Sequence, residues 1–205
     1  MARTPFQWVV KSANFGNTPY VVPAGKVAIL NTFRIAPPTT IIGSNDVFGL
    51  TVTYNGTPAA MLLYAYFSER YGPMVLAAGD TIGSTAAGGT GPSAANEVFG
   101  VQGFHYNPSS IKVPFNRLMN TSSSYTVPAG KYVVFNIFNA NGVGAFTLKI
   151  NGTPVASSAR SITQPGPASG PFMAAAGQTI SFDAIMPFTV WTGNIWLTGF
   201  LYNQL

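Results

Sequence analysis

The segment Tyr20-Val-Val-Pro-Ala-Gly-Lys26 returns 105 residues later as Tyr125-Thr-Val-Pro-Ala-Gly-Lys131. Three further segments repeat in the same order, at offsets of 96 to 98 residues. They are Tyr54-Asn-Gly-Thr-Pro58 with Ile150-Asn-Gly-Thr-Pro154, Gly72-Pro-Met-Val-Leu-Ala-Ala-Gly-Asp-Thr-Ile82 with Gly170-Pro-Phe-Met-Ala-Ala-Ala-Gly-Gln-Thr-Ile180, and Gly103-Phe-His-Tyr-Asn107 with Gly199-Phe-Leu-Tyr-Asn203. Four collinear matches indicate a tandem duplication of a unit of about 100 residues, a common size for a β-sandwich.

Each copy carries the turn signals of antiparallel strands. Asn55-Gly56 and Asn151-Gly152 predict two-residue hairpins, because both central positions of a type I′ turn need positive φ. Pro23-Ala-Gly25 and Pro128-Ala-Gly130 predict type I turns with Pro at the second position and Gly at the fourth. These turns would join consecutive strands of a sheet.

The residues between the turns alternate with the period of a strand. Phe146, Leu148 and Ile150 are apolar, whereas the residues between them are polar. No long stretch free of Gly and Pro shows a helical period. We therefore predict an all-β fold of two tandem, duplicated antiparallel β-sandwich domains, 1–108 with an N-terminal arm and 109–205.

The composition excludes several classes of function. Charged residues make up 7% of the chain, against about 25% in an average soluble domain. The 10 basic residues are scattered singly, so no stripe is present that could neutralise the phosphates of a nucleic acid. The chain has no cysteine, which excludes a disulfide framework and thiolate metal sites.

The sequence carries no signal for membrane insertion or export. Its longest apolar run, Met61 to Phe67, is far shorter than a membrane span. The first residues lack the apolar core of a signal peptide. We expect no membrane partner and no translocation by the general secretion route.

Titratable residues are too few and too dispersed to suggest catalysis. The five acidic residues show no motif spacing, and Asp80 has Gln178 as its counterpart, which suggests a solvated turn carboxylate. His105 is the only histidine, and its counterpart is Leu201, which suggests a side chain that fills a strand position. We expect no catalytic residue, no cofactor and no metal site.

Aromatic residues are the remaining candidates for function. In the last strand Ile195, Leu197 and Leu201 share one face, and the other face is also apolar. One face should meet the domain core, and the other either the sister domain or another subunit. The residues expected at an interface are Phe6, Trp8, Trp191, Trp196, Phe200 and Tyr202.

The repeated pattern resembles the jelly-roll-type β-sandwich modules of tailed-bacteriophage virion proteins. The pattern runs from Val-Pro-Ala-Gly-Lys through a strand, the Asn-Gly-Thr-Pro turn and Ala-Gly-Asp/Gln-Thr-Ile to a closing Gly-Phe-x-Tyr-Asn strand. Such modules occur in capsid decoration (cement) proteins and in tail or fibre proteins. The resemblance implies jelly-roll-like domains in a non-enzymatic structural protein of a virus particle, with capsid decoration as the leading interpretation.

The resemblance also implies partners and a location. The partner would be the major capsid protein or another virion protein, the chain would form a dimer or trimer, and it would join the virion in the host cytoplasm. The arm from Ala2 to Asn17, with Phe6 and Trp8, is a candidate clamp, because an extended arm can add a strand to a neighbour's sheet edge. The alternative is that this segment is simply the first strand of the first domain.

A carbohydrate- or receptor-binding module, such as a tail or fibre tip, is the alternative function. Aromatic rings stack on sugars and amide side chains bind sugar hydroxyls. The candidates are Trp8, Trp191, Trp196, Tyr64, Tyr66 and Tyr71. An exposed coplanar aromatic pair beside unpaired amides would favour sugar binding, whereas burial of the same rings between chains would favour assembly.

Overall fold

In the part of the chain that the structure describes, all regular elements are β-strands, which confirms the all-β prediction. The computed structural model describes residues 3–11, 18–35, 49–62, 69–87, 98–109, 111–139, 146–158, 169–184 and 195–204. These residues form sixteen strands in four antiparallel sheets. Within these ranges no helix is long and apolar enough to cross a membrane.

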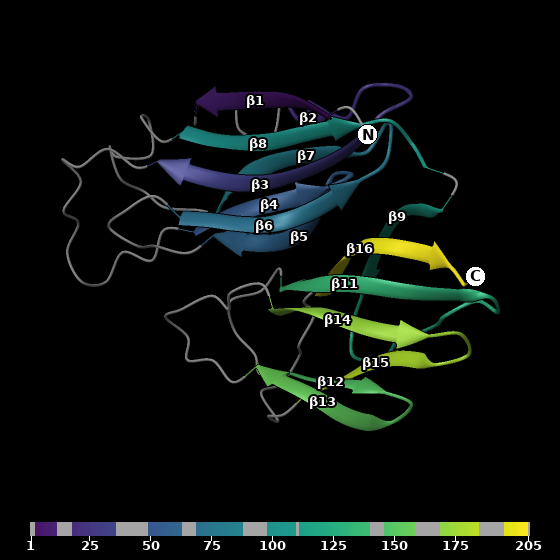
Figure 1. The fold of residues 1–205 in the computed structure, drawn as a ribbon. Coiled ribbons are helices and arrows are strands. Elements are labelled where there is room, and N and C mark those ends of the chain that lie inside the picture. The colour runs from purple at the N-terminus through teal and green to yellow at the C-terminus, as the bar shows by residue number, and fades with distance from the viewer. Residues whose placement is uncertain are drawn as a thin grey trace.

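The first eight strands form two facing sheets, which we call domain one (Figure 1). One sheet has the order β1 (Arg3–Lys11), β8 (Val98–Tyr106), β3 (Val27–Ile35) and β6 (Glu69–Leu76). The other has the order β2 (Tyr20–Val21), β7 (Thr81–Ala87), β4 (Gly49–Tyr54) and β5 (Thr57–Leu62). Strands distant in sequence are thus neighbours in both sheets.

The last eight strands repeat this arrangement in domain two. Its first sheet has the order β9 (Lys112–Met119), β16 (Ile195–Asn203), β11 (Lys131–Asn139) and β14 (Ser169–Ala175). Its second has the order β10 (Ser124–Thr126), β15 (Thr179–Ala184), β12 (Phe146–Ile150) and β13 (Thr153–Ser158). The strand orders 1-8-3-6 and 2-7-4-5 recur in each domain, so the molecule is a tandem pair of eight-stranded, jelly-roll-like sandwiches.

The hairpin prediction is confirmed and the other turn prediction needs a correction. Asn55 and Asn151 have φ of 49° and 51°, and the glycine after each also has positive φ, as a type I′ turn requires. In the Pro-Ala-Gly-Lys segments the Lys26 N–H donates to the Pro23 carbonyl, and Gly25 has φ of 68°. Pro therefore occupies the first turn position and Gly the third, which makes these type II turns rather than type I.

The repeated motifs bind one another at one end of each sandwich. The Asn55 side chain accepts a hydrogen bond from the Thr81 N–H (2.7 Å), and Asn151 accepts one from the Thr179 N–H (2.8 Å). The closing strand joins the same end, because Lys26 donates to the Asn107 amide oxygen and Lys131 donates to Asn203 in the second copy. The duplicated segments are thus structural parts of the fold.

Each domain has its own hydrophobic core between its sheets. In β16 the residues Ile195, Leu197 and Leu201 belong to the core of domain two, as the alternation predicts. Gly199 lies on the same side, where a Cβ would come within 2.0 Å of the Val134 carbonyl oxygen. Gly103 in β8 faces the same restriction at 2.1 Å from the Ile29 carbonyl oxygen, so close packing of neighbouring strands explains the glycine of the closing motif.

Candidate functional site: a sheet face that binds an edge strand

The junction of the two domains is a sheet face packed on a sheet edge. The outer face of β9, β16 and β11 contacts β6 and β5, which are edge strands of domain one (Figure 1). A row of three uncharged polar side chains crosses this face: Asn116 on β9, Thr198 on β16 and Asn136 on β11. We call these three residues the polar row of domain two.

The polar row binds the backbone of β6. The Thr198 hydroxyl accepts from the Val75 N–H at 2.8 Å and donates to the Val75 carbonyl at 3.0 Å. The Asn116 amide donates to the same carbonyl at 2.8 Å, and the Asn136 amide donates to the Pro73 carbonyl at 3.1 Å. Side chains of one domain thus replace the strand that β6 lacks on its outer side.

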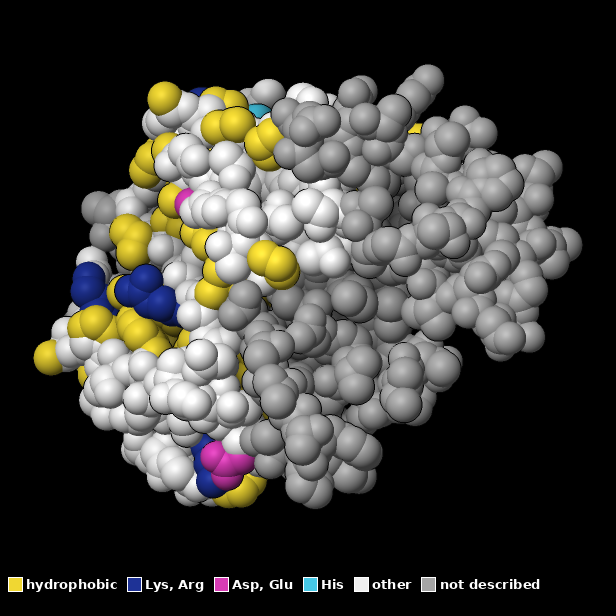
Figure 2. All heavy atoms as spheres, turned by 180° about the vertical axis from the view of Figure 1, so that it is seen from behind, with side chains coloured by type: hydrophobic (Ala, Val, Ile, Leu, Met, Phe, Trp, Pro, Cys, Tyr) yellow, Lys and Arg dark blue, Asp and Glu magenta, His cyan; other side chains and the backbone are white. Residues whose placement is uncertain are grey.

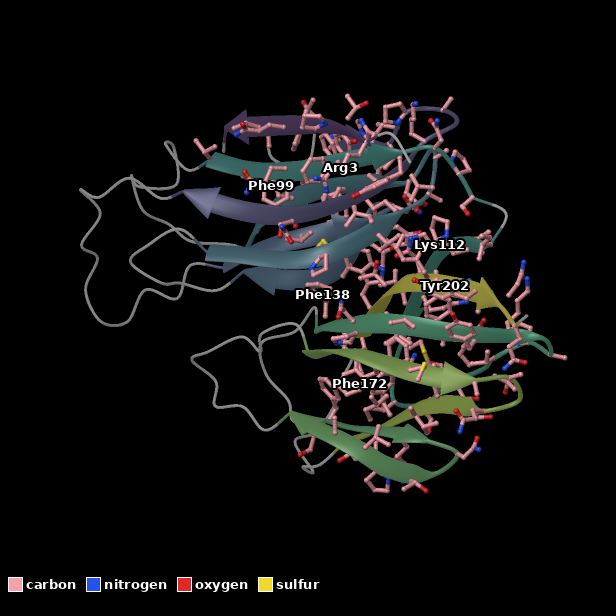
Figure 3. The ribbon with its side chains drawn as sticks, in the orientation of Figure 1. Arg3, Phe99, Lys112, Phe138, Phe172 and Tyr202 are labelled. Atoms are coloured by element: carbon pink, nitrogen blue, oxygen red, sulfur yellow. The ribbon has the colours of Figure 1, made fainter. Side chains whose placement is uncertain are left out.

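Aromatic packing covers one end of this junction. Trp196 is fully buried and belongs to a cluster with the core residues of domain one. Its ring stacks on Tyr54 with centroids 5.0 Å apart, and its Nε1–H donates to the Asn116 amide oxygen at 3.2 Å. Phe138 joins the same cluster and lies between the two domains in Figure 3, whereas Phe99 and Phe172 lie within domains one and two.

The other end of the junction is more open. Phe200 is half-buried under the Lys112 ammonium, which lies 4.2 Å from the ring centroid. Both residues line a hollow of about 220 Å³ with residues of β3 and β8 in domain one. Tyr202 stacks on Tyr132 with centroids 4.8 Å apart, and Figure 3 shows Tyr202 on β16 near Lys112.

Domain one carries the counterpart of this face. Gln7 on β1, Gln102 on β8 and Asn31 on β3 form a second row of uncharged polar side chains, which we call the polar row of domain one. The three residues line a shallow hollow of about 490 Å³ together with Phe104 and Pro5. Arg3 lies over the Phe104 ring at 4.8 Å, as Lys112 lies over Phe200 in domain two.

The interface residues expected from sequence fall in different places. Phe6 and Trp8 lie on the inward side of β1 and pack against the core of domain one. Trp196 lies between the domains, and Phe200 and Tyr202 lie half-buried on the same face of β16. Trp191 lies outside the described residues, as do Tyr64 and Tyr66, and the side chain of Tyr71 is also outside them.

The segment expected as an arm is a strand over its described part. Arg3–Lys11 pairs with β8 along its whole length, from Arg3 opposite Tyr106 to Lys11 opposite Val98. The described part of the segment therefore matches the alternative prediction, in which it is the first strand of domain one. The remaining residues of the segment lie outside the described ranges.

The two titratable candidates have structural roles. Asp80 is half-buried rather than solvated, because its carboxylate accepts hydrogen bonds from the Tyr54 hydroxyl at 3.0 Å and the Ala77 N–H at 2.8 Å. Gln178 accepts the equivalent turn bond from Ala175 at 2.7 Å. Burial and the Asp80 carboxylate raise the pKa of Tyr54, which keeps its phenol protonated.

His105 fills a strand position, as its Leu201 counterpart suggests. Its ring stacks on Phe6 with centroids 4.1 Å apart and forms a hydrogen bond with the Tyr20 hydroxyl. Burial, together with the Lys26 charge, lowers the pKa of His105, and burial raises the pKa of Tyr20 to about 12. At neutral pH a protonated phenol therefore faces a neutral imidazole across this hydrogen bond, and Phe6 packs against the imidazole ring.

The criterion for a sugar platform is met only in part. Tyr132 and Tyr202 are nearly parallel, with an interplanar angle of 5°, but they stack on each other instead of forming one extended surface. The neighbouring amide of Asn203 is bound to Lys131. Among the described residues, no group of three or more acidic or histidine side chains could hold a metal ion.

The polar rows were not predicted from the sequence. Their signal is a polar residue at an outward position of a middle strand, which also describes an ordinary solvated residue. Among the described residues of the face drawn in Figure 2, hydrophobic side chains form small patches between uncharged groups and a few charged ones. No protein-family model and no curated protein matches the chain.

Proposed function

We propose that the chain is a non-enzymatic structural protein of a virus particle, most specifically a capsid decoration protein of a tailed bacteriophage. The observation that carries the assembly role is the junction between the domains. There the chain recognises an edge strand through amide and hydroxyl side chains, with Trp196 as a buried aromatic anchor. An anchor of this kind within a polar surround is how protein interfaces gain affinity.

The surface chemistry also supports assembly. Only 7% of the residues are charged, so a partner that covers the surface of the chain removes few charged side chains from water. The two titratable candidates, Asp80 and His105, are both bound within the fold. Two parts of the proposal rest on the resemblance of the repeated turn motifs to phage modules. They are the choice of a virion as the particle and of its major capsid protein as the partner.

The test is the mass of the purified chain by light scattering, alone and after mixing with isolated tailed-phage capsids and, separately, tails. Co-sedimentation with capsids and a higher capsid melting temperature are the expected results. Binding to tails alone would replace the decoration role with a tail role. A chain that ignores both particles and binds a polysaccharide would refute the assembly role.

A further inference from the structure

The polar row of domain one matches the polar row of domain two position by position. In both sheets the row crosses the first, last and third strands of the domain, and strand pairing places its members side by side. The matched pairs are Gln7 with Asn116, Gln102 with Thr198 and Asn31 with Asn136. Gln102 carries both a donor and an acceptor, the two functions that Thr198 uses on Val75.

The kind of strand edge that a polar row binds is also present in both domains, at β6 and at β14. Val75 on β6 pairs with Ile29, and its counterpart Met173 on β14 pairs with Val134 in the same register. Val75 directs its N–H and carbonyl outward to Thr198, so by register Met173 directs both groups away from β11. The β14 edge therefore offers the hydrogen-bonding groups that a polar row binds.

Exposure distinguishes the two edges. Val75 is 5% exposed because domain two covers it, whereas Met173 is 65% exposed. The edge strand of the facing sheet shows the same contrast: Ala59 on β5 is fully buried in the cluster that contains Trp196, and its counterpart Val155 on β13 is 46% exposed. Domain two thus presents an apolar edge of the kind that domain one buries within the chain.

We infer that the β14 edge of a second copy of the chain binds the polar row of domain one, and repeats between chains the contact that joins the domains within one chain. Each copy then donates an edge at domain two and receives one at domain one. Because the two surfaces differ, the contact is head-to-tail and forms a ring where its rotation closes and an open chain where it does not.

The contact between chains is expected to be weaker than the one within the chain. Gly100 on β8 takes the place of Trp196, and Ile150 takes the place of Tyr54, so the stacked aromatic pair is absent from the second contact. The contact within the chain is further favoured by the short connection between the domains. Reversible, concentration-dependent association follows.

The inference deepens the proposed assembly role and rests on that role for its purpose, but its test needs no virus particle. A monomer that binds capsids would refute this inference alone. An associating chain that ignores capsids and tails would refute the proposed function alone.

The experiment is sedimentation velocity of the full chain at concentrations up to about 1 mM, where weak contacts become populated. Two single variants each remove one surface: Gln102→Glu places a carboxylate against the incoming carbonyl, and Met173→Glu places one on the edge that must be buried. Val21→Glu is the matched control, because Val21 is 51% exposed on β2 in the other sheet of domain one.

Wild type and Val21→Glu are expected to associate, whereas each of the other variants should remain monomeric, with a dissociation constant raised at least about tenfold. A 1:1 mixture of Gln102→Glu and Met173→Glu should form a dimer and nothing larger, because each retains the surface that the other lacks. Circular dichroism and melting temperature verify that the variants are folded, and Gln7→Glu, at an exposed position in the same row, provides a second receiving-face variant.

Three outcomes would overturn the inference. They are a wild-type chain that stays monomeric at the highest concentration, single variants that associate as wild type does, and a mixture of variants that fails to dimerise. A monomeric wild type that binds an oligosaccharide in a Gln102-dependent manner would assign the hollow to a glycan instead.

Discussion

The substitution Thr198→Val tests the junction between the domains with almost no change in side-chain shape. Thr198 is fully buried, and its hydroxyl makes two hydrogen bonds to Val75, one as acceptor and one as donor. In the variant the Val75 carbonyl keeps the Asn116 amide at 2.8 Å, but the Val75 N–H loses its partner. One buried backbone donor is therefore left unsatisfied.

The magnitude follows from these two losses. An unsatisfied buried donor costs about 1 to 3 kcal/mol, and the lost hydroxyl–carbonyl bond adds up to about 1 kcal/mol. We expect the free energy of unfolding to fall by about 2 to 3 kcal/mol. With a urea slope of about 2 kcal/mol per molar, the midpoint should move down by about 1 M.

The assay is urea unfolding followed by tryptophan fluorescence, with Thr85→Val as the control. Thr85 is an exposed threonine on β7, where a surface substitution is expected to change stability by less than about 0.5 kcal/mol. If Thr198→Val loses no more stability than Thr85→Val, the hydrogen bonds to Val75 do not hold the domains together, and the reasoning on the polar rows fails with them.

Two further predictions concern the interior of each domain. His105→Leu installs the residue of the second copy, and its free energy of unfolding should depend less on pH than that of wild type. The pKa of His105 is lower in the folded state than the unfolded value of about 6.5. The neutral imidazole therefore contributes its full stability above that unfolded value, and the contribution is lost as pH falls through the folded pKa. Urea midpoints at a series of pH values from neutral to mildly acidic measure this, and parallel curves for the two proteins would contradict it. In Gly199→Ala the free energy of unfolding should fall by about 3 kcal/mol, because the new Cβ would lie 2.0 Å from the Val134 carbonyl oxygen. Gly177→Ala has open space around its Cβ and only a φ of 76° to oppose a side chain, so its free energy of unfolding, measured by the same urea experiment, should fall by about 1 to 2 kcal/mol. An equal loss in both variants would show that the strands adjust.

The fold was predictable because its turns are encoded locally. Asn55-Gly56 and Asn151-Gly152 adopt the positive φ that their residue types favour, and the alternation in β16 places Ile195 and Leu197 in the core. The type of the Pro-Ala-Gly-Lys turns was predicted wrongly, because sequence alone does not fix which residue begins a turn. The glycine at position three, with positive φ, decides it.

The candidate site was less predictable because it depends on pairs of distant residues. Trp196 and Phe6 are both aromatic and both lie on strands, but only the structure shows that one lies between the domains and the other inside domain one. Asn116 and Thr198 are ordinary polar strand residues by sequence. Their role depends on Val75, which lies in the other half of the chain.

Comparison of the two copies separates residues that fold the chain from residues that recognise a partner. Positions that form the turns keep the same residue or the same hydrogen bond in both copies, as Asn55 and Asn151 do. The stacked aromatic pair at the junction is not kept, because Trp196 is matched by Gly100 and Tyr54 by Ile150. A duplicated domain must form the same turns in both copies. Its two recognition surfaces, in contrast, have different neighbours: one neighbour belongs to the same chain, and the other would belong to a second copy. Both rows retain their polar groups, but only the row of domain two has the aromatic anchor beside it. This difference is expected if the contact within a chain is strong and the contact between chains is weaker.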